Sequence, residues 1–254
     1  MRLVAITHVP SPNIQRGERT HVQDAEIDYE LALRQHAAYR EALRNCGAQV
    51  VVLDVNRTMP DCVFVEDTAL VLDELAIMMS PGAESRRGEP AGIEPAIKQF
   101  REVKRVARPA TIDGGDIVVA GKAIYIGESG RTNAAGIAAM RQLLTPFGYA
   151  VESVPVYDCL HLKSACSALP GGRFLVNRDW IDVTPLVGEL VDVPPHEPWA
   201  SDVLVIGQQI IVSDAFPATV QCLVDLGHEC VPVSVSEFAK AEGGVTCLSL
   251  VFQA

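Results

Sequence analysis

Hydrophobic and polar positions along the chain follow two alternating patterns that predict helices and strands in a repeated order. Residues 29–46 carry apolar side chains three and four positions apart, with Asp28 as a cap before them and Gly47 as a stop after them, which predicts an amphipathic helix. Residues 49–53 form an apolar run after Gln49 without polar alternation, a pattern typical of a strand buried on both faces. Elsewhere hairpin-like pairs of apolar runs come before the helix and strand, so the repeated unit is ββαβ.

Short apolar runs bounded by glycine, proline and acidic residues mark the remaining elements. Strands are expected at residues 3–9, 69–72, 75–80, 103–107, 117–120, 123–127, 151–156, 161–169, 173–177, 190–193, 202–206, 209–213, 230–235 and 246–252. Helices are expected at residues 85–100, from Asn133 to Pro146, shortly before residue 190, and from Pro217 to Gly227. The mixture predicts the α/β fold class.

The hairpins recur at a nearly constant spacing. They begin near Glu66, Asp113, His161, Asp202 and Cys247, at separations of 47, 48, 41 and 45 positions. A period of this length is typical of repeat and propeller-like assemblies. The fifth unit lacks a second hairpin strand, which residues 3–9 could supply, so that the termini close the ring and remove exposed sheet edges. We therefore expect one domain over residues 1–254, a five-bladed α/β propeller of ββαβ units.

The repeat also predicts where polar side chains meet, because residues at the hairpin mouths would converge on the axis of the ring. Cys247 follows two glycines there, and taken alone it reads as a small core residue. With His161 nearby, a neighbouring imidazole would lower the thiol pKa and carry protons for a cysteine nucleophile. An acid such as Asp113 could orient that ring. The alternative for His161 is a hydrogen-bonded core histidine.

Several carboxylates, from Asp61, Glu66, Asp67 and Asp113, would surround the cysteine. Like charges raise the pKa of a thiol, which suits an amide or ester hydrolase poorly. The arrangement makes sense if the substrate is a cation, since paired carboxylates match the planar donors of a guanidinium. The alternative is that these carboxylates, above all that of Asp61, belong to solvated turn residues.

Arginines lie near two expected helix starts, where a guanidinium is unfavourable for the helix dipole unless an anion is bound. Arg86 and Arg87 precede one helix and Arg131 precedes another. A substrate carboxylate would serve as that anion. The alternative for each is an ordinary surface arginine, above all for Arg87.

Composition narrows the function classes. The 254 residues are 48% hydrophobic with a formal net charge of −11, which allows a sizeable core and argues against a nucleic-acid partner. The seven cysteines show no close pair spacing and no compact metal signature, so we expect free thiols, a reducing compartment such as the cytoplasm, and no metal site. No apolar run approaches the roughly 20 residues of a membrane helix, and residues 3–9 are too short for a signal peptide.

At the candidate site residues and around them, the sequence resembles the dimethylarginine dimethylaminohydrolase family of the guanidino-group modifying, or pentein, superfamily. The matching stretches, in family order, are residues 60–67, 81–87, 112–116, 131–133, 160–164 and 244–247. The resemblance implies a five-fold α/β propeller that hydrolyses Nω-methylated arginines to citrulline and a methylamine without a cofactor. A homodimer stays open.

The resemblance also implies roles for individual residues. Cys247 would be the nucleophile, attacking the guanidinium carbon to give a covalent thiouronium, with His161 as general acid and base and Asp113 as its orienting acid. Substrate would be bound by Asp61, Phe64, Glu66, Asp67, Arg86, Arg131 and the Ala241 carbonyl. In the N-terminal lid loop, counting back from Asp28 places Arg19, next to Glu18, where the family often has leucine.

Two other functions remain open at this point. Within the enzymes, the alternative is an arginine deiminase-like hydrolase of another guanidine or amidine, although arginine deiminases carry an inserted domain for which 254 residues leave no room. Outside the enzymes, the chain could be a non-catalytic binder of cationic amino acids. A weaker option is capture of zinc by Cys247 and His161.

Overall fold

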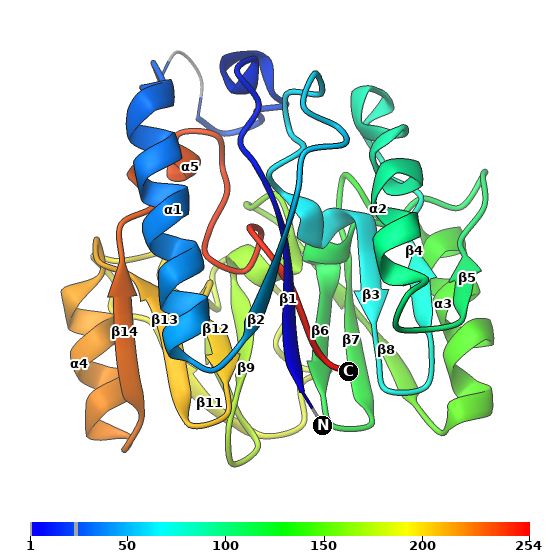
Figure 1. Cartoon of the computed structure of the whole chain (residues 1–254). Helices are drawn as coiled ribbons and strands as arrows, with labels where there is room; N and C mark the ends of the chain where they lie inside the picture. The colour runs from blue at the N-terminus through cyan, green and yellow to red at the C-terminus, as the bar shows by residue number, and fades with distance from the viewer. Residues whose placement is uncertain (1, 23–24) are drawn as a thin grey trace.

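The computed structural model describes residues 2–22 and 25–254 as five three-stranded mixed sheets arranged around a central axis (Figure 1). In each sheet the middle strand pairs with one antiparallel neighbour and one parallel neighbour. This is the strand order that a ββαβ unit produces, so the expected α/β propeller is confirmed. No helix in these described ranges is long and apolar enough to cross a membrane.

The modules follow one another along the chain, each with its own strands and outer segment. The first two contain η2 (Val65–Thr68), β3 (Ala69–Val71), β4 (Ala76–Met78), α2 (Glu89–Ile97) and β5 (Val103–Arg105), then η4 (Gly114–Asp116), β6 (Ile117–Ala120), β7 (Ala123–Glu128), α3 (Ala134–Leu144) and β8 (Ala150–Pro155). The next two contain η6 (Leu162–Ser164), β9 (Cys166–Leu169), β10 (Arg173–Val176) and β11 (Glu189–Asp192), then β12 (Leu204–Ile206), β13 (Gln209–Ser213), α4 (Pro217–Asp225) and β14 (Glu229–Val233).

The fifth module joins the two ends of the chain. It consists of α5 (Ser236–Ala239), β15 (Leu250–Gln253), β1 (Leu3–His8), α1 (Tyr29–Asn45) and β2 (Gln49–Leu53). Strand β1 lies between antiparallel β15 and parallel β2, with Val4 opposite Phe252. The predicted closure by the N-terminal strand is therefore confirmed, and Figure 1 shows the two termini next to each other.

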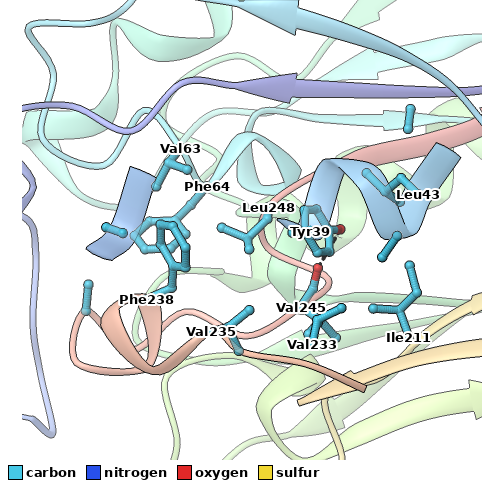
Figure 2. Packing of buried hydrophobic residues seen from close by; sticks show 14 of the residues in the cluster. Tyr39, Leu43, Val63, Phe64, Ile211, Val233, Val235, Phe238, Val245 and Leu248 are labelled. Atoms are coloured by element: carbon cyan, nitrogen blue, oxygen red, sulfur yellow. Dashed lines mark hydrogen bonds between the residues drawn. The ribbon is translucent and has the colours of Figure 1, made fainter. Parts of the chain in front are cut away.

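Helix α1 forms where the pattern predicted it. The Asp28 side chain accepts the Leu31 N–H at 3.0 Å, which caps the first turn. Gly47 takes the left-handed φ of +88° that ends the helix. The inner face buries Tyr39 and Leu43 in a core cluster that also contains Val245 and Leu248, as Figure 2 shows. The helix thus supports the segment that carries Cys247.

Several expected element boundaries were wrong. The expected helix 85–100 begins with a 3₁₀ turn, η3 (Glu84–Arg86), and is α-helical only over α2, with Pro90 near its start. The described residues between Asn177 and Glu189 form turns and no helix. A short apolar run in the sequence does not show which of its residues will form turns, because tertiary contacts decide where the helix or strand ends.

The strands at two predicted site residues are also shorter than expected. The run 161–169 is a strand only from Cys166, and the run 246–252 only from Leu250. His161 and Cys247 both lie outside the strands because side-chain and loop contacts near the axis replace ladder hydrogen bonds. Both residues are therefore free to point toward the axis rather than alternate across a sheet.

Candidate active site

The 3₁₀ turns η2, η4 and η6 each come just before the first hairpin strand of their module, and η4 contacts both η2 and η6. They position Asp67, Asp113 and His161. The turns can pack this closely because η4 contains two glycines. A Cβ on Gly114 would lie 2.0 Å from the Glu66 carbonyl oxygen, and one on Gly115 would lie 2.6 Å from His161 Nδ1. The Asp-Gly-Gly-Asp stretch is thus required by close packing.

The His161 ring is buried between two carboxylates. Its Nε2 lies 3.2 Å from Asp113 Oδ2, and its Nδ1 lies 4.0 Å from Asp67 Oδ1. Burial alone would lower the His161 pKa, but Asp67, Asp116 and Asp113 raise it to about 9. The imidazole is therefore protonated at pH 7 and can act as an acid.

Cys247 lies in a turn before β15 whose backbone is held from two sides. Its carbonyl oxygen accepts the Glu66 N–H at 3.3 Å. The Tyr39 hydroxyl donates to the Val245 carbonyl at 2.8 Å (Figure 2). A Cβ on Gly243 would lie 2.2 Å from a ring atom of Phe64, so glycine lets the turn pack against that ring. The sulfur is fixed by packing rather than by a strand.

The electrostatic environment of the Cys247 sulfur disfavours the thiolate. Burial raises the pKa of the thiol well above its usual range, and the carboxylates of Asp202, Glu66 and Asp67 raise it further. At pH 7 the sulfur in this structure is a neutral thiol. A positive charge placed near the sulfur would favour the thiolate.

Cys247 and His161 line one cavity, although they are far apart in the sequence. The same cavity is lined by six other residues predicted from the sequence, namely Asp61, Phe64, Asp67, Arg86, Arg131 and Ala241. Its volume is about 20 Å³, room for about one water molecule, so an amino-acid ligand requires the walls to move.

Arg86 lines this cavity, but its guanidinium is held by protein groups. It donates to Asp67 Oδ2 at 2.5 Å, to Glu89 Oε2 at 2.7 Å and to the Phe64 carbonyl at 3.1 Å. Arg131 is less engaged, with its Nη1 3.9 Å from Asp113 Oδ2. The two arginines are therefore not equivalent as anion sites.

Three of the predicted residues lie away from the cavity wall. Asp113 is completely buried behind His161. Glu66 faces a second cavity of about 290 Å³, where its carboxylate contacts Lys163. The Arg19 guanidinium donates to the carbonyl oxygens of Ala25 and Gln15, within the loop itself.

In the N-terminal loop expected to act as a lid, the residue that lines the cavity is Glu18 rather than Arg19. Its backbone N–H donates to Asp61 Oδ2 at 3.1 Å, and its carboxylate accepts the Ser85 hydroxyl. A Cβ on Gly17 would lie 2.4 Å from Asp61 Oδ1, so glycine allows this approach. Counting positions back from Asp28 pointed to Arg19 and not to Glu18, because the number of residues in an irregular loop does not fix the path that its backbone takes.

Two further residues were not predicted. Glu242 has a left-handed φ of 62°, and its Oε1 accepts the N–H groups of Thr20, His21 and Val22 in the lid. Asp202 lies behind the Cys247 turn, hydrogen-bonded to Thr246. The repeat contained a signal for Asp202, which begins the fourth hairpin, whereas nothing local marks Glu242.

One group of possible metal ligands occurs in this region. Single donor atoms of Asp67, Asp113 and His161 lie within 4.8 Å of one another. The guanidiniums of Arg86 and Arg131 lie against those two carboxylates, and the imidazole is protonated at neutral pH. Because positive charge is already in place, this group is a proton and charge network rather than a cation site.

Five three-stranded modules around an axis, with a cysteine and a histidine facing one cavity, define a pentein-class α/β propeller. Relatives make the assignment specific. A family model described as "N,N dimethylarginine dimethylhydrolase, eukaryotic" matches residues 11–164. N(G),N(G)-dimethylarginine dimethylaminohydrolase of Streptomyces coelicolor is 43% identical over 97% of this chain and 95% of its own length. The chain belongs to the dimethylarginine dimethylaminohydrolase family.

Other comparisons agree in sequence and in structure. The Pseudomonas aeruginosa enzyme of that name is 36% identical over 89% of this chain and 90% of its own length. A solved structure of it, a mutant complexed with citrulline, superposes with a TM-score of 0.90 at 32% identity, covering 99% of this chain and all of that one. The N-terminal domain of an arginine dihydrolase has a TM-score of 0.89 at 18% identity, which shows the shared fold alone.

Proposed function

We propose that this chain hydrolyses asymmetric dimethylarginine and monomethylarginine to citrulline and dimethylamine or methylamine. The proposal rests on the observation that Cys247, His161 and Asp67 line the same cavity, in a chain of the dimethylarginine dimethylaminohydrolase family. A guanidinium is a planar cation, and buried carboxylates in a cavity wall bind it through charge-assisted hydrogen bonds.

Cys247 is the proposed nucleophile. Because burial and then nearby carboxylates raise the pKa of its thiol, the positive charge of the substrate is what favours the thiolate. The thiolate sulfur bonds to the central carbon of the guanidinium and gives a tetrahedral adduct. Covalent catalysis of this kind divides one difficult displacement into two easier steps.

His161 is the proposed general acid and base. Its ring, protonated at pH 7, gives a proton to the departing amine as the C–N bond breaks, which leaves an S-alkylthiouronium on Cys247. The neutral ring then takes a proton from water, whose oxygen bonds to the thiouronium carbon. The C–S bond breaks, the hydroxyl proton of the adduct passes to solvent, citrulline leaves and the thiolate is restored. Asp113, 3.2 Å from Nε2, keeps the ring oriented throughout.

Substrate binding is proposed to exchange one guanidinium for another. Asp67 is paired with Arg86 in this structure, and we propose that the substrate guanidinium replaces Arg86 there, with Phe64 and Asp61 beside it. Arg86, once released, would join Arg131 at the substrate carboxylate. The Ala241 carbonyl would accept the α-ammonium group.

The test is citrulline release from asymmetric dimethylarginine, monomethylarginine and arginine, measured side by side with the Cys247→Ser variant. We expect turnover of the methylated substrates, a covalent mass increase on Cys247, and a loss of at least about 10³-fold in the variant. Normal citrulline production by Cys247→Ser would rule out the covalent scheme. Binding without turnover would make the chain a carrier of cationic amino acids, and a preference for arginine would make it a deiminase.

The setting of the protein is also proposed. All seven cysteines, which lie in the described part of the chain, are free thiols, and this supports a reducing compartment such as the cytoplasm. A homodimer stays a prediction, which light scattering of the purified chain would test.

A further inference from the structure

Asp202 is a buried carboxylate directly behind the turn that carries Cys247. Its Oδ1 accepts the Thr246 N–H at 2.9 Å. A Cβ on Gly244 would lie 2.4 Å from the Asp202 carboxyl carbon, so glycine is required there for the turn to lie against this carboxylate. Asp202 does not line the catalytic cavity and instead forms part of a separate cavity of about 400 Å³.

The Thr246 hydroxyl connects Asp202 with a second carboxylate. Its oxygen lies 2.8 Å from Glu66 Oε2 and 3.1 Å from Asp202 Oδ2. A hydroxyl has one hydrogen to donate, so it can donate to only one of these oxygens at a time. Lys163 Nζ lies 2.5 Å from Glu66 Oε1 and offsets the charge of Glu66, while Asp202 has no ion-pair partner among the described residues.

The Cys247 sulfur reaches this carboxylate. Its Sγ lies 3.9 Å from Asp202 Oδ2, within the range of a hydrogen bond donated by a thiol. Other groups that face the sulfur or Asp202 are the carboxylates Glu66 and Asp67 of η2, Lys163 of η6, His161 and the Tyr39 hydroxyl of α1. Among the carboxylates of the described residues, Asp202 alone makes a hydrogen bond with this sulfur.

We propose that Asp202 is a positioning residue for Cys247, which holds the nucleophile turn through Thr246 and keeps the thiol protonated until a cationic substrate binds. The proposal rests on the assignment of Cys247 as the nucleophile. The S–H group donates to the Asp202 carboxylate, which favours the neutral thiol, and the negative charge opposes loss of its proton. A bound guanidinium offsets that charge, and the thiol then releases its proton to water. Protecting the sulfur in this way limits its reaction with oxidants and other electrophiles.

The test is the pH dependence of alkylation of Cys247 by iodoacetamide in the free enzyme, followed on the Cys247 peptide by mass spectrometry. In Asp202→Asn the amide oxygen still accepts the Thr246 N–H, but the charge is gone. We expect the midpoint of the alkylation profile to fall by about one pH unit or more, which is about tenfold faster alkylation below the midpoint. An unchanged midpoint in a folded variant would overturn the proposal.

Two further variants keep the result interpretable. Asp214→Asn removes a carboxylate that lines the same separate cavity but is exposed, and it should leave the midpoint unchanged. Asp202→Ser removes the charge without adding bulk near Gly244, and it replaces Asp202→Asn if that variant does not fold. Since alkylation requires no methylarginine, the result is independent of whether the proposed substrate is hydrolysed.

Discussion

Glu66 and Asp67 are neighbours in the sequence, but they line two different cavities. Asp67 faces the catalytic cavity, where its carboxylate accepts from Arg86 at 2.5 Å and from the Gly115 N–H at 2.9 Å. Glu66 faces the second cavity, where it contacts Lys163. Both belong to the 3₁₀ turn η2, whose three residues per turn direct successive side chains about 120° apart.

The two carboxylates also differ in protonation. Burial opposes the ionisation of both. For Asp67, His161 and Arg86 outweigh burial and lower its pKa. For Glu66, burial outweighs Lys163, and its pKa is raised to about 7. Asp67 is therefore ionised at pH 7 in the cavity of Cys247 and His161, while Glu66 in the second cavity titrates near neutrality.

The largest expected effect separates these two carboxylates. Asp67→Asn leaves Arg86 and His161 without their shared carboxylate, so we expect kcat/KM for dimethylarginine to fall by about 10²- to 10³-fold. Glu66→Gln, a matched amide substitution one residue away, should cost less than about tenfold. Steady-state kinetics on folded variants, verified by circular dichroism, make the comparison. Equal losses of kcat/KM in the two variants would show that the two cavities are not functionally distinct.

A smaller effect is expected at the lid, whose residue Glu18 lines the cavity of Cys247 and His161. Glu242→Ala removes the acceptor shared by the N–H groups of residues 20–22, so the closed lid should be less populated. We expect KM to rise about tenfold with kcat changed less than threefold. Glu237→Ala removes a nearby carboxylate of α5 that contacts Asp28 and Lys240, outside the cavity, and serves as the control. A kcat loss without a KM change would contradict a lid role.

The smallest effect concerns stability and pH. The folded-state pKa of His161, about 9, is above the ordinary value of 6.5, so its contribution to stability is complete below pH 6.5 and is lost as pH rises through 9. His161→Asn removes this dependence. We expect the fall in Tm between pH 6.5 and pH 9.5 to be several °C smaller in the variant, since about 1 kcal/mol shifts Tm by 2–4 °C in a domain of this size. Identical slopes in thermal denaturation would show that the ring is neutral in the folded protein.

The sequence by itself determined the modular architecture. The change between strand and helix periods, repeated about every 45 residues, was sufficient to predict five three-stranded units and the closing role of residues 3–9, although the helix expected before residue 190 is not formed. It also predicted that His161 and Cys247 share a cavity, because equivalent positions of a closed repeat face the same axis. The periodicity of apolar residues predicts the helices and strands because each of these elements buries its own apolar face.

Only the tertiary structure decided which neighbours of that axis contact one another. It pairs Arg86 with Asp67, turns Glu66 to the other side, brings Glu18 rather than Arg19 to the cavity, and places Asp202 behind the sulfur. These choices depend on 3₁₀ turns and on glycines that accept close contacts. Side-chain direction in such irregular segments is set by packing against residues distant in the chain, and no local pattern encodes it.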